Sequence, residues 1–539
     1  MIKHSVKIVS LLLVIALFAC KTPKPKSDSE AVSSSVKTAT STKKKNILFI
    51  AVDDLKPLLS NYGETKMHTP NFDRLADMGM TFTNAHVQQA VCGPSRASVM
   101  TGTYPDRTKV WDLHTDFRES APDLVSMPEY LIAQGYETSA TGKIYHQGSV
   151  ASEHDGKSWS IPYTRPDYFD SNFGQPSYSF YQNPETKARL EELTVEGKAK
   201  GLKGGKLRKY VFNELRPSTE CIEAPDEAYA AGLYTIEGLK KIDQILEIGK
   251  PFFVGVGYQK PHLPFVAPKK YWDLYDREKI ELSKFQELSE GTPEFAYHSF
   301  GELRAYSDIP NDLKVGIKIS EDKQRELIHG YMACISYIDA QIGKLLDGLE
   351  QRGILDETVI VLWGDHGYHL GDHTLWNKHS NFEQATRIPF MFAGPGVEKN
   401  QKSNHPVDLV DLFPTIFDLA GIPIHNQVDG ISLKPLLDDN KNTSVEKDYA
   451  ISQYPRHGKR MGYALRTDRY RYTEWHKNGY KSYNPYNSNN IEARELYDYE
   501  KDPLETRNLV DDPKYKSVVE QLNLKLKTHL KDQYKSLNK

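Results

Sequence analysis

The segment 91–102 carries the residues whose types and spacing are best suited to chemistry. Pro94 is tolerated in the first turn of a helix, so a helix that includes residues 95–100 places Cys92 at its N-terminus. Free backbone amides and the helix dipole attract an anion there, and Arg96 adds a positive charge with a forked set of donors. The segment is therefore suited to a tetrahedral oxyanion. The alternative is a small buried thiol beside a surface arginine.

Other residues with chemical potential follow stretches that predict strands. Because open α/β sheets place their ligands at the carboxyl ends of the strands, we expect these residues to meet at one edge of a sheet. For Asp53 and Asp54, and for Lys143 and His146, an ordinary surface position is the alternative when each is taken alone. The full set is Asp53 and Asp54 after 46–52, Lys143 and His146 after 136–140, His262 after 251–256, Asp365 and His366 after 358–363, and Lys378 at the end of 369–378.

Strands and helices alternate along most of the chain, which predicts a large, mostly parallel sheet sandwiched by helices. A further strand is expected at 81–85, and helices at 71–80, 128–134, 230–248, 323–349 and 411–421. Near the C-terminus, short strands at 450–454, 461–465, 470–475 and 495–498 precede a helix at 514–534. We therefore predict a catalytic domain over 46–435 and a C-terminal subdomain over 436–539, built as a small antiparallel sheet plus a helix.

Residues 148–221 are rich in Tyr, Pro, Asn and Gly, which predicts long loops over the scaffold. This stretch holds a basic cluster, for which a solvated loop is favoured over contact with an anionic polymer. Its members are Lys198, Lys200, Lys203, Lys206, Arg208 and Lys209.

Composition limits the classes of function. A chain of 539 residues with 39% hydrophobic residues can bury a large core and a smaller one. The formal net charge of -3 at pH 7 argues against a nucleic-acid binder, which is normally basic. Of the remaining thiols, Cys221 and Cys334 could pair, but a free buried Cys334 is an equal alternative.

The N-terminus predicts export. Residues 1–20 combine a basic start with an apolar run that is short for a membrane span, and 17–20 resemble a bacterial lipobox that ends in Cys20. We expect a lipoprotein signal peptide, a flexible tether over 21–45, and a protein held at a membrane of the cell envelope by lipidated Cys20. The alternative is a plain secretory signal.

The motif around Cys92 is similar to the signature of type I, formylglycine-dependent sulfatases, Cys-x-Pro-Ser-Arg with a downstream Thr-Gly. Asp53-Asp54, Gly142-Lys143, Lys260-Pro261-His262 and Gly364-Asp365-His366-Gly367 recur in the order seen in that family. Within it, the chain most resembles iduronate-2-sulfatase-like members, through 257–265, 376–382, 452–456 and 461–467. The resemblance runs from about residue 46 to residue 508 and implies the alkaline-phosphatase-like sulfatase fold.

This resemblance implies that a maturase oxidises Cys92 to formylglycine, whose hydrated aldehyde attacks sulfur and then helps to expel sulfate. It implies one Ca²⁺ ion bound by Asp53, Asp54, the residue at position 92, Asp365 and His366. Positive groups around the sulfate would be Arg96, Lys143 and Lys378. His262 would protonate the departing sugar oxygen, and His146 would orient or activate the formylglycine.

One departure from the wider family leaves a rival hypothesis. His366 stands where many sulfatases have Asn, and Asp and His clusters suit zinc. Zinc phosphatases and phosphodiesterases of the same superfold use such clusters with a Ser or Thr nucleophile. A lipoprotein that binds sulfated glycans without cleaving them is the other alternative. The intact motif around Cys92, together with His262, weighs against both.

The resemblance suggests a sulfated oligo- or polysaccharide that contains uronic acids as the substrate. A lipoprotein signal further suggests a bacterium that degrades an external polysaccharide. Animal glycosaminoglycans and algal ulvan both fit this description. In the C-terminal subdomain, Arg456, His457 and Trp475 are expected to border the pocket.

Overall fold

The computed structural model describes residues 44–147, 150, 152–165, 181–438, 445–456, 458–482 and 485–537. The chain divides into two units, Met1–Lys43, which holds no described residue, and Lys44–Lys539. The predictions on Cys20 and His457 therefore lie outside the described residues. Among the helices of the described ranges, none is long and apolar enough to cross a membrane.

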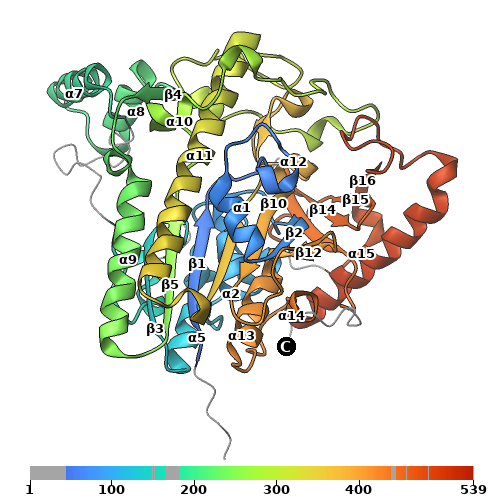
Figure 1. The fold of residues 1–539 in the computed structure, drawn as a ribbon. Helices are drawn as coiled ribbons and strands as arrows, with labels where there is room; N and C mark the ends of the chain where they lie inside the picture. The colour runs from blue at the N-terminus through green and yellow to red at the C-terminus, as the bar shows by residue number, and fades with distance from the viewer. Residues whose placement is uncertain are drawn as a thin grey trace, which may run out of the picture. The chain divides into compact units, whose positions relative to one another are not determined.

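A sheet forms the centre of Lys44–Lys539 (Figure 1). It has eight strands in the order β11-β2-β10-β7-β1-β5-β3, with β12 beside β2. Strand β1 pairs in parallel with β5 and β7, and β5 pairs in parallel with β3. Strand β10 is antiparallel to both β7 and β2, so β2 runs in the same direction as β7. The strands are β1 (Asn46–Val52), β2 (Gly79–His86), β3 (Glu137–Gly142), β5 (Phe252–Tyr258), β7 (Thr358–Gly364), β10 (Arg387–Ala393), β11 (Gln401–Ser403) and β12 (Val407–Asp408).

The predicted fold class is confirmed, since this sheet is mostly parallel and covered on both faces. Strand β1 is buried along its whole length, and its side chains alternate between two cores. Leu48 and Ile50 pack in the core of α1 (Pro70–Asp77), α9 (Ala230–Ile248) and α11 (Glu321–Gln351). Ile47 and Phe49 pack in the core of α2 (Cys92–Thr101), α5 (Met127–Ala133) and α13 (Leu412–Ala420). Each such buried side chain stabilises the fold by about 1.5–3 kcal/mol.

The prediction of long loops over 148–221 is wrong for the second half of that stretch. It folds into α7 (Pro184–Ala199) and α8 (Gly204–Glu214), followed by β4 (Thr219–Ile222), which pairs with β6 (Phe265–Pro268). The side chain of Asn183 caps α7 by accepting from two backbone amides. These helices contain few apolar residues because α7 packs through one narrow stripe, which includes Leu190 and Leu193. The basic cluster lies on these helices and the turn between them.

The C-terminal elements match the prediction in type and order. A four-stranded antiparallel sheet consists of β13 (Ala450–Arg456), β14 (Arg460–Arg466), β15 (Tyr470–His476) and β16 (Ile491–Asp498), and α15 (Lys516–Leu537) packs against it. The other α-helices of the described ranges are short. They are α3 (Pro105–Thr108), α4 (Phe117–Ser120), α6 (Ser152–Asp155), α10 (Lys269–Trp272), α12 (Glu383–Thr386) and α14 (Lys434–Leu437).

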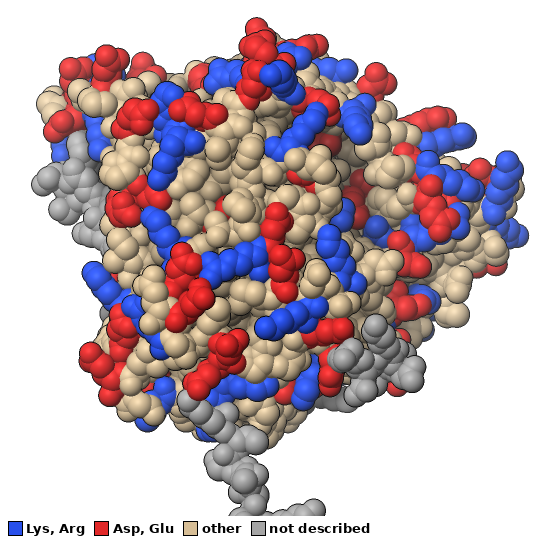
Figure 2. Space-filling view, viewed as in Figure 1, with Lys and Arg blue, Asp and Glu red and all other residues tan. Residues whose placement is uncertain are grey.

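Two of the predictions made from composition concern the pairing of Cys221 with Cys334 and the charge of the surface. Cys221 is an exposed free thiol and Cys334 a buried free thiol, so the two do not pair in this structure. On the face shown in Figure 2, Lys and Arg side chains are interspersed with Asp and Glu. That face carries no continuous basic stripe of the kind that tracks a nucleic-acid backbone.

Candidate active site

The sheet brings the predicted residues to one edge. Asp53 and Asp54 follow β1, Lys143 follows β3, and Asp365 follows β7. Gly142 turns the chain at the end of β3 with φ +75°, and a Cβ there would lie 2.1 Å from the carbonyl oxygen of Gly257. Only glycine allows this close approach, which is how Lys143 reaches the site.

Two buried carboxylates share one guanidinium. Arg96 donates from Nε to Oδ2 of Asp365 at 2.8 Å and from Nη2 to Oδ1 of Asp53 at 3.1 Å. Its Nη1 donates to the backbone carbonyls of Lys143 and Ile144. The remaining oxygen of Asp365, Oδ1, accepts from the backbone N–H of Asp54 at 2.9 Å. Arg96 thus holds the acids at a fixed spacing.

Two lysines balance the acids. Nζ of Lys143 lies 2.6 Å from Oδ2 of Asp53, and Nζ of Lys378 lies 3.0 Å from Oδ2 of Asp54. Burial alone would raise the pKa of Asp53, but the charges of Lys143 and Arg96 hold that pKa well below its ordinary value. Asp54 has a φ of +61°, a strained backbone conformation typical of functional positions.

Cys92 begins α2, as predicted, and its thiol faces an imidazole. Sγ lies 3.3 Å from Nε2 of His366, whose Nδ1 donates to the carbonyl of Gly367 at 3.0 Å. Burial raises the pKa of Cys92 well above its ordinary value, and Asp53 adds to the shift. The unmodified side chain is therefore a neutral thiol, which is a poor nucleophile.

The arrangement around His366 fits a divalent metal ion. Ligand atoms of Asp53, Asp54, Cys92 and His366 all lie within 4.8 Å of one another. Nδ1 of His366 is directed at a backbone carbonyl, so Nε2 faces the acids: Oδ1 of Asp54 lies 3.3 Å away and Oδ1 of Asp365 lies 3.6 Å away. Carboxylate oxygens and an imidazole nitrogen this close together can serve as ligands to one cation.

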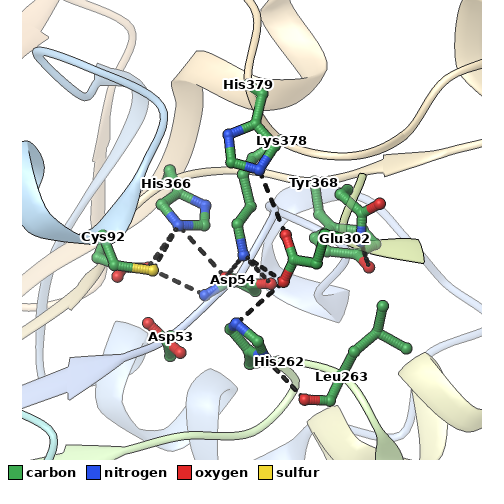
Figure 3. A network of polar contacts seen from close by, with 12 residues as sticks. Asp53, Asp54, Cys92, His262, Leu263, Glu302, His366, Tyr368, Lys378 and His379 are labelled. Atoms are coloured by element: carbon green, nitrogen blue, oxygen red, sulfur yellow. Dashed lines mark hydrogen bonds and ion pairs between the residues drawn. The ribbon is translucent and has the colours of Figure 1, made fainter. Parts of the chain in front are cut away.

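A second group of residues lies beside these acids (Figure 3). His262 donates from Nδ1 to the carbonyl of Leu263 at 2.7 Å, and its Nε2 lies 3.1 Å from Oε1 of Glu302. The same oxygen accepts from Nζ of Lys378 at 2.9 Å, while Oε2 lies 3.3 Å from Nε2 of His379. Lys378 therefore joins the acids around Arg96 to the group around Glu302.

His146 lies in the turn after β3, and burial, with the charge of Lys143, lowers its pKa to about 3. Its Nδ1 is buried without a hydrogen-bond partner in the described part of the structure. His146 is neutral and has a free polar atom, but it forms no hydrogen bond to the other candidate residues.

A cavity of ≈ 740 Å³ adjoins Glu302 and is also lined by His298, His379, Tyr454 and Arg456. The prediction that Arg456 borders a pocket is therefore consistent with the structure, although its guanidinium is occupied by backbone carbonyls of Phe295, Ala296 and His379. The prediction for Trp475 is wrong. This side chain is fully buried and so does not border a pocket. Its Nε1 donates to Glu495, and its ring packs edge-on against Phe295.

Sequence reasoning missed several residues of the site. Glu302 follows no strand and belongs to no motif, so nothing in its local sequence marked it. His379 and Lys260 do lie in the segments that resemble sulfatases, which was the available signal. Lys260 donates to the carbonyls of His262 and Pro264, both at 2.7 Å, and so shapes the turn that carries His262.

Comparison with known proteins places this geometry in context. The family model "Sulfatase" matches residues 45–422, and the model "N-sulphoglucosamine sulphohydrolase, C-terminal" matches residues 371–532. Human iduronate 2-sulfatase is 31% identical over 89% of this chain and 94% of its own length. A protein of Formosa agariphila named "Sulfatase" is 30% identical over 95% of this chain and 90% of its own length.

Solved structures share the fold. A protein solved in complex with its substrate D-glucosamine-2-N,6-O-disulfate superposes with a TM-score of 0.67 and 21% identity, over 92% of this chain and 98% of that one. A phosphonate monoester hydrolase from Silicibacter pomeroyi superposes with a TM-score of 0.64 and 21% identity, over 90% and 95% of the two chains.

Proposed function

This chain belongs to the sulfatase family, and we propose that it is a formylglycine- and calcium-dependent sulfatase that removes sulfate esters from uronic-acid-containing saccharides. The observation that carries the proposal is Cys92 at the N-terminus of α2, with Asp53, Asp54 and Asp365 clustered beside it. This is a nucleophile position next to a cation site, at the edge where the sheet places ligands.

Formylglycine at position 92 would provide the nucleophile that the thiol of Cys92 cannot. The buried Cys92 has a raised pKa and so gives little thiolate at neutral pH. Its hydrated aldehyde would supply one hydroxyl for attack on sulfur and a second hydroxyl for expulsion of the sulfate. The amide groups at the start of α2 stabilise negative charge beside this position.

Asp53, Asp54, Asp365 and His366 would hold the metal ion. The carboxylate oxygens favour Ca²⁺, whereas the imidazole nitrogen of His366 is the one donor that would also suit zinc. The bound ion would supply Lewis-acid chemistry and neutralise charge on the sulfate oxygens. Arg96 keeps the acids in place through its bonds to Asp53 and Asp365.

The remaining residues act on the sulfate and on the leaving saccharide. Lys143 and Lys378 each place an ammonium group at the rim of the acid cluster, where they bind the sulfate oxygens. His262 gives its Nε2 proton to the departing sugar oxygen. His146 uses its unpartnered Nδ1 to orient the hydroxyls at position 92.

The substrate class and the location of the protein are parts of the same proposal. The kinship with iduronate 2-sulfatase and the structural likeness to a protein bound to a glucosamine disulfate support a sulfated saccharide, such as a glycosaminoglycan or ulvan oligosaccharide. The N-terminal sequence supports an exported lipoprotein, anchored through Cys20. Incorporation of a labelled fatty acid by the native host, and its loss in Cys20→Ser, tests the anchor.

Release of free sulfate from a panel of defined sulfated oligosaccharides tests the activity. We expect release from at least one uronic-acid-containing member, by protein co-produced with a maturase and supplied with Ca²⁺. Phosphate and phosphonate esters belong in the same panel, because a phosphonate monoester hydrolase shares the fold. Activity confined to those esters, or binding without cleavage, would contradict the proposal.

A further inference from the structure

Glu302 connects His262 and Lys378, two residues on the side of the site where the leaving group would depart. A single oxygen, Oε1, contacts both Nε2 of His262, at 3.1 Å, and Nζ of Lys378, at 2.9 Å. Burial would raise the pKa of Glu302, but the charges of Lys378 and His262 hold it well below its ordinary value, so the side chain is an ionised carboxylate.

The hydrogen bonds of His262 define which of its atoms can donate. Nδ1 faces the backbone carbonyl of Leu263 and Nε2 faces the carboxylate of Glu302, and neither partner has a proton to give. Both ring nitrogens must therefore be N–H donors in this arrangement. A glutamine in place of Glu302 could turn its NH₂ group toward Nε2, which would leave the ring as an acceptor.

A cavity that could hold the leaving saccharide adjoins Glu302. Glu302 and His379 line the cavity of ≈ 740 Å³, together with Tyr454 and His298. His262 contacts Glu302, which lines this cavity, and the two side chains are 28% and 20% exposed, so neither is sealed off from solvent.

We propose that Glu302 is a positioning residue for departure of the saccharide: it orients His262 as the proton donor. This inference rests on the proposed sulfatase function. As the bond between sulfur and the ester oxygen breaks, its electron pair stays on that oxygen, which takes the proton from Nε2 of His262. The saccharide leaves as an alcohol, the ring becomes neutral, and the sulfate stays on the enzyme.

The test compares two leaving groups on the matured, calcium-loaded enzyme. A sugar alkoxide needs a proton to depart, whereas the anion released from 4-nitrophenyl sulfate is stable without one. We expect Glu302→Gln to lower kcat on the sulfated saccharide by about 100-fold, within the range of general acid catalysis, and to change hydrolysis of 4-nitrophenyl sulfate little. Glu247→Gln is the matched control, since Glu247 is an exposed carboxylate on α9 that does not line the cavity, and it should change neither rate.

A double mutant shows whether Glu302 acts through His262. The variant His262→Ala should show the same selective loss, and His262→Ala combined with Glu302→Gln should be no slower on the saccharide than His262→Ala alone. If Glu302→Gln fails to fold, as judged by its thermal unfolding, Glu302→Asp keeps the charge and shifts it by one methylene. That variant should then lose saccharide hydrolysis selectively and to a smaller extent.

Equal losses on both substrates, or a full additional loss in the double mutant, would overturn the role of Glu302 while the sulfatase function stands. A wild-type enzyme that releases sulfate from neither substrate would instead refute the proposed function, and this inference with it.

Discussion

The Nε atom of Arg96 lies 2.8 Å from Oδ2 of Asp365, and both side chains are fully buried. The guanidinium also bridges to Asp53 at 3.1 Å. A buried guanidinium that clamps two carboxylates sets their separation, so the proposed metal site depends on Arg96 even though no ligand atom comes from it. The charge expected to face the sulfate is instead directed at the acids.

Replacing Arg96 with methionine should therefore damage folding as well as activity. Two buried carboxylates would lose their partner, which costs about 3–5 kcal/mol of the free energy of unfolding. Chemical denaturation measures this loss, and saturating Ca²⁺ should recover part of it by compensating the acids. Arg325→Met is the control, because its pair with Glu321 on the surface of α11 contributes less than about 1 kcal/mol. Equal denaturation midpoints for Arg96→Met and the wild type would contradict this role.

The role of His366 as a direct ligand predicts a change in metal affinity. Removal of its imidazole in His366→Ala takes away the Nε2 atom that faces Asp54 and Asp365. We expect the affinity for Ca²⁺ to fall by about tenfold or more, as judged by titration calorimetry on chelator-treated protein. His379→Ala is the comparison, since His379 contacts Glu302 instead of the acid cluster. Unchanged calcium affinity in His366→Ala would exclude direct ligation.

Stability should fall as the solution becomes acidic, in part because of His529 on α15. Burial, with the charge of Lys447, lowers the pKa of His529 to about 3, against about 6.5 in the unfolded chain. Between these values only the unfolded state binds the proton, so stability is lost as pH falls below about 6.5. Relative to His529→Gln, the wild type should lose about 1.4 kcal/mol between pH 7.5 and pH 5.5. Parallel denaturation curves for the two proteins would show that His529 is not buried in its neutral form.

Arg456 should matter for stability more than for recognition of the substrate. Its guanidinium donates to the carbonyls of Phe295, Ala296 and His379, and so ties β13 to the loop that carries Glu302. In Arg456→Ala these carbonyls lose a charged donor. Each carbonyl left buried and unpaired should lower the free energy of unfolding by about 1–3 kcal/mol. Thermal unfolding should show the loss. A variant as stable as the wild type but with an altered preference among saccharides would assign Arg456 to the substrate instead.

The contrast between Asp365 and Glu302 shows what sequence could predict. Asp365 follows a strand buried on both faces, and parallel strands bring their carboxyl ends together, so strand order alone places it near Asp53. Glu302 reaches the same site from an irregular loop, whose path depends on packing that no local pattern records. No strand was predicted over 387–393, where β10 lies. Its antiparallel pairing with β7 was missed as well, because a buried strand carries no mark of its direction.

Helices α7 and α8 were mistaken for loops for a related reason. Their surfaces are mostly charged, and a narrow apolar stripe is hidden in a sequence dominated by Lys and Glu. The capping residue Asn183 was the available signal, since it precedes Pro184 at the first helical position.

The most direct test of the central claim is the rate of sulfate release as a function of the fraction of Cys92 converted to formylglycine. Mass spectrometry of the peptide that contains Cys92 gives that fraction, because the conversion exchanges sulfur for oxygen. With protein made at graded levels of a maturase, the account predicts a rate proportional to the converted fraction and no release from Cys92→Ala. Full-rate release from protein whose Cys92 is unmodified, or from Cys92→Ala, would contradict it.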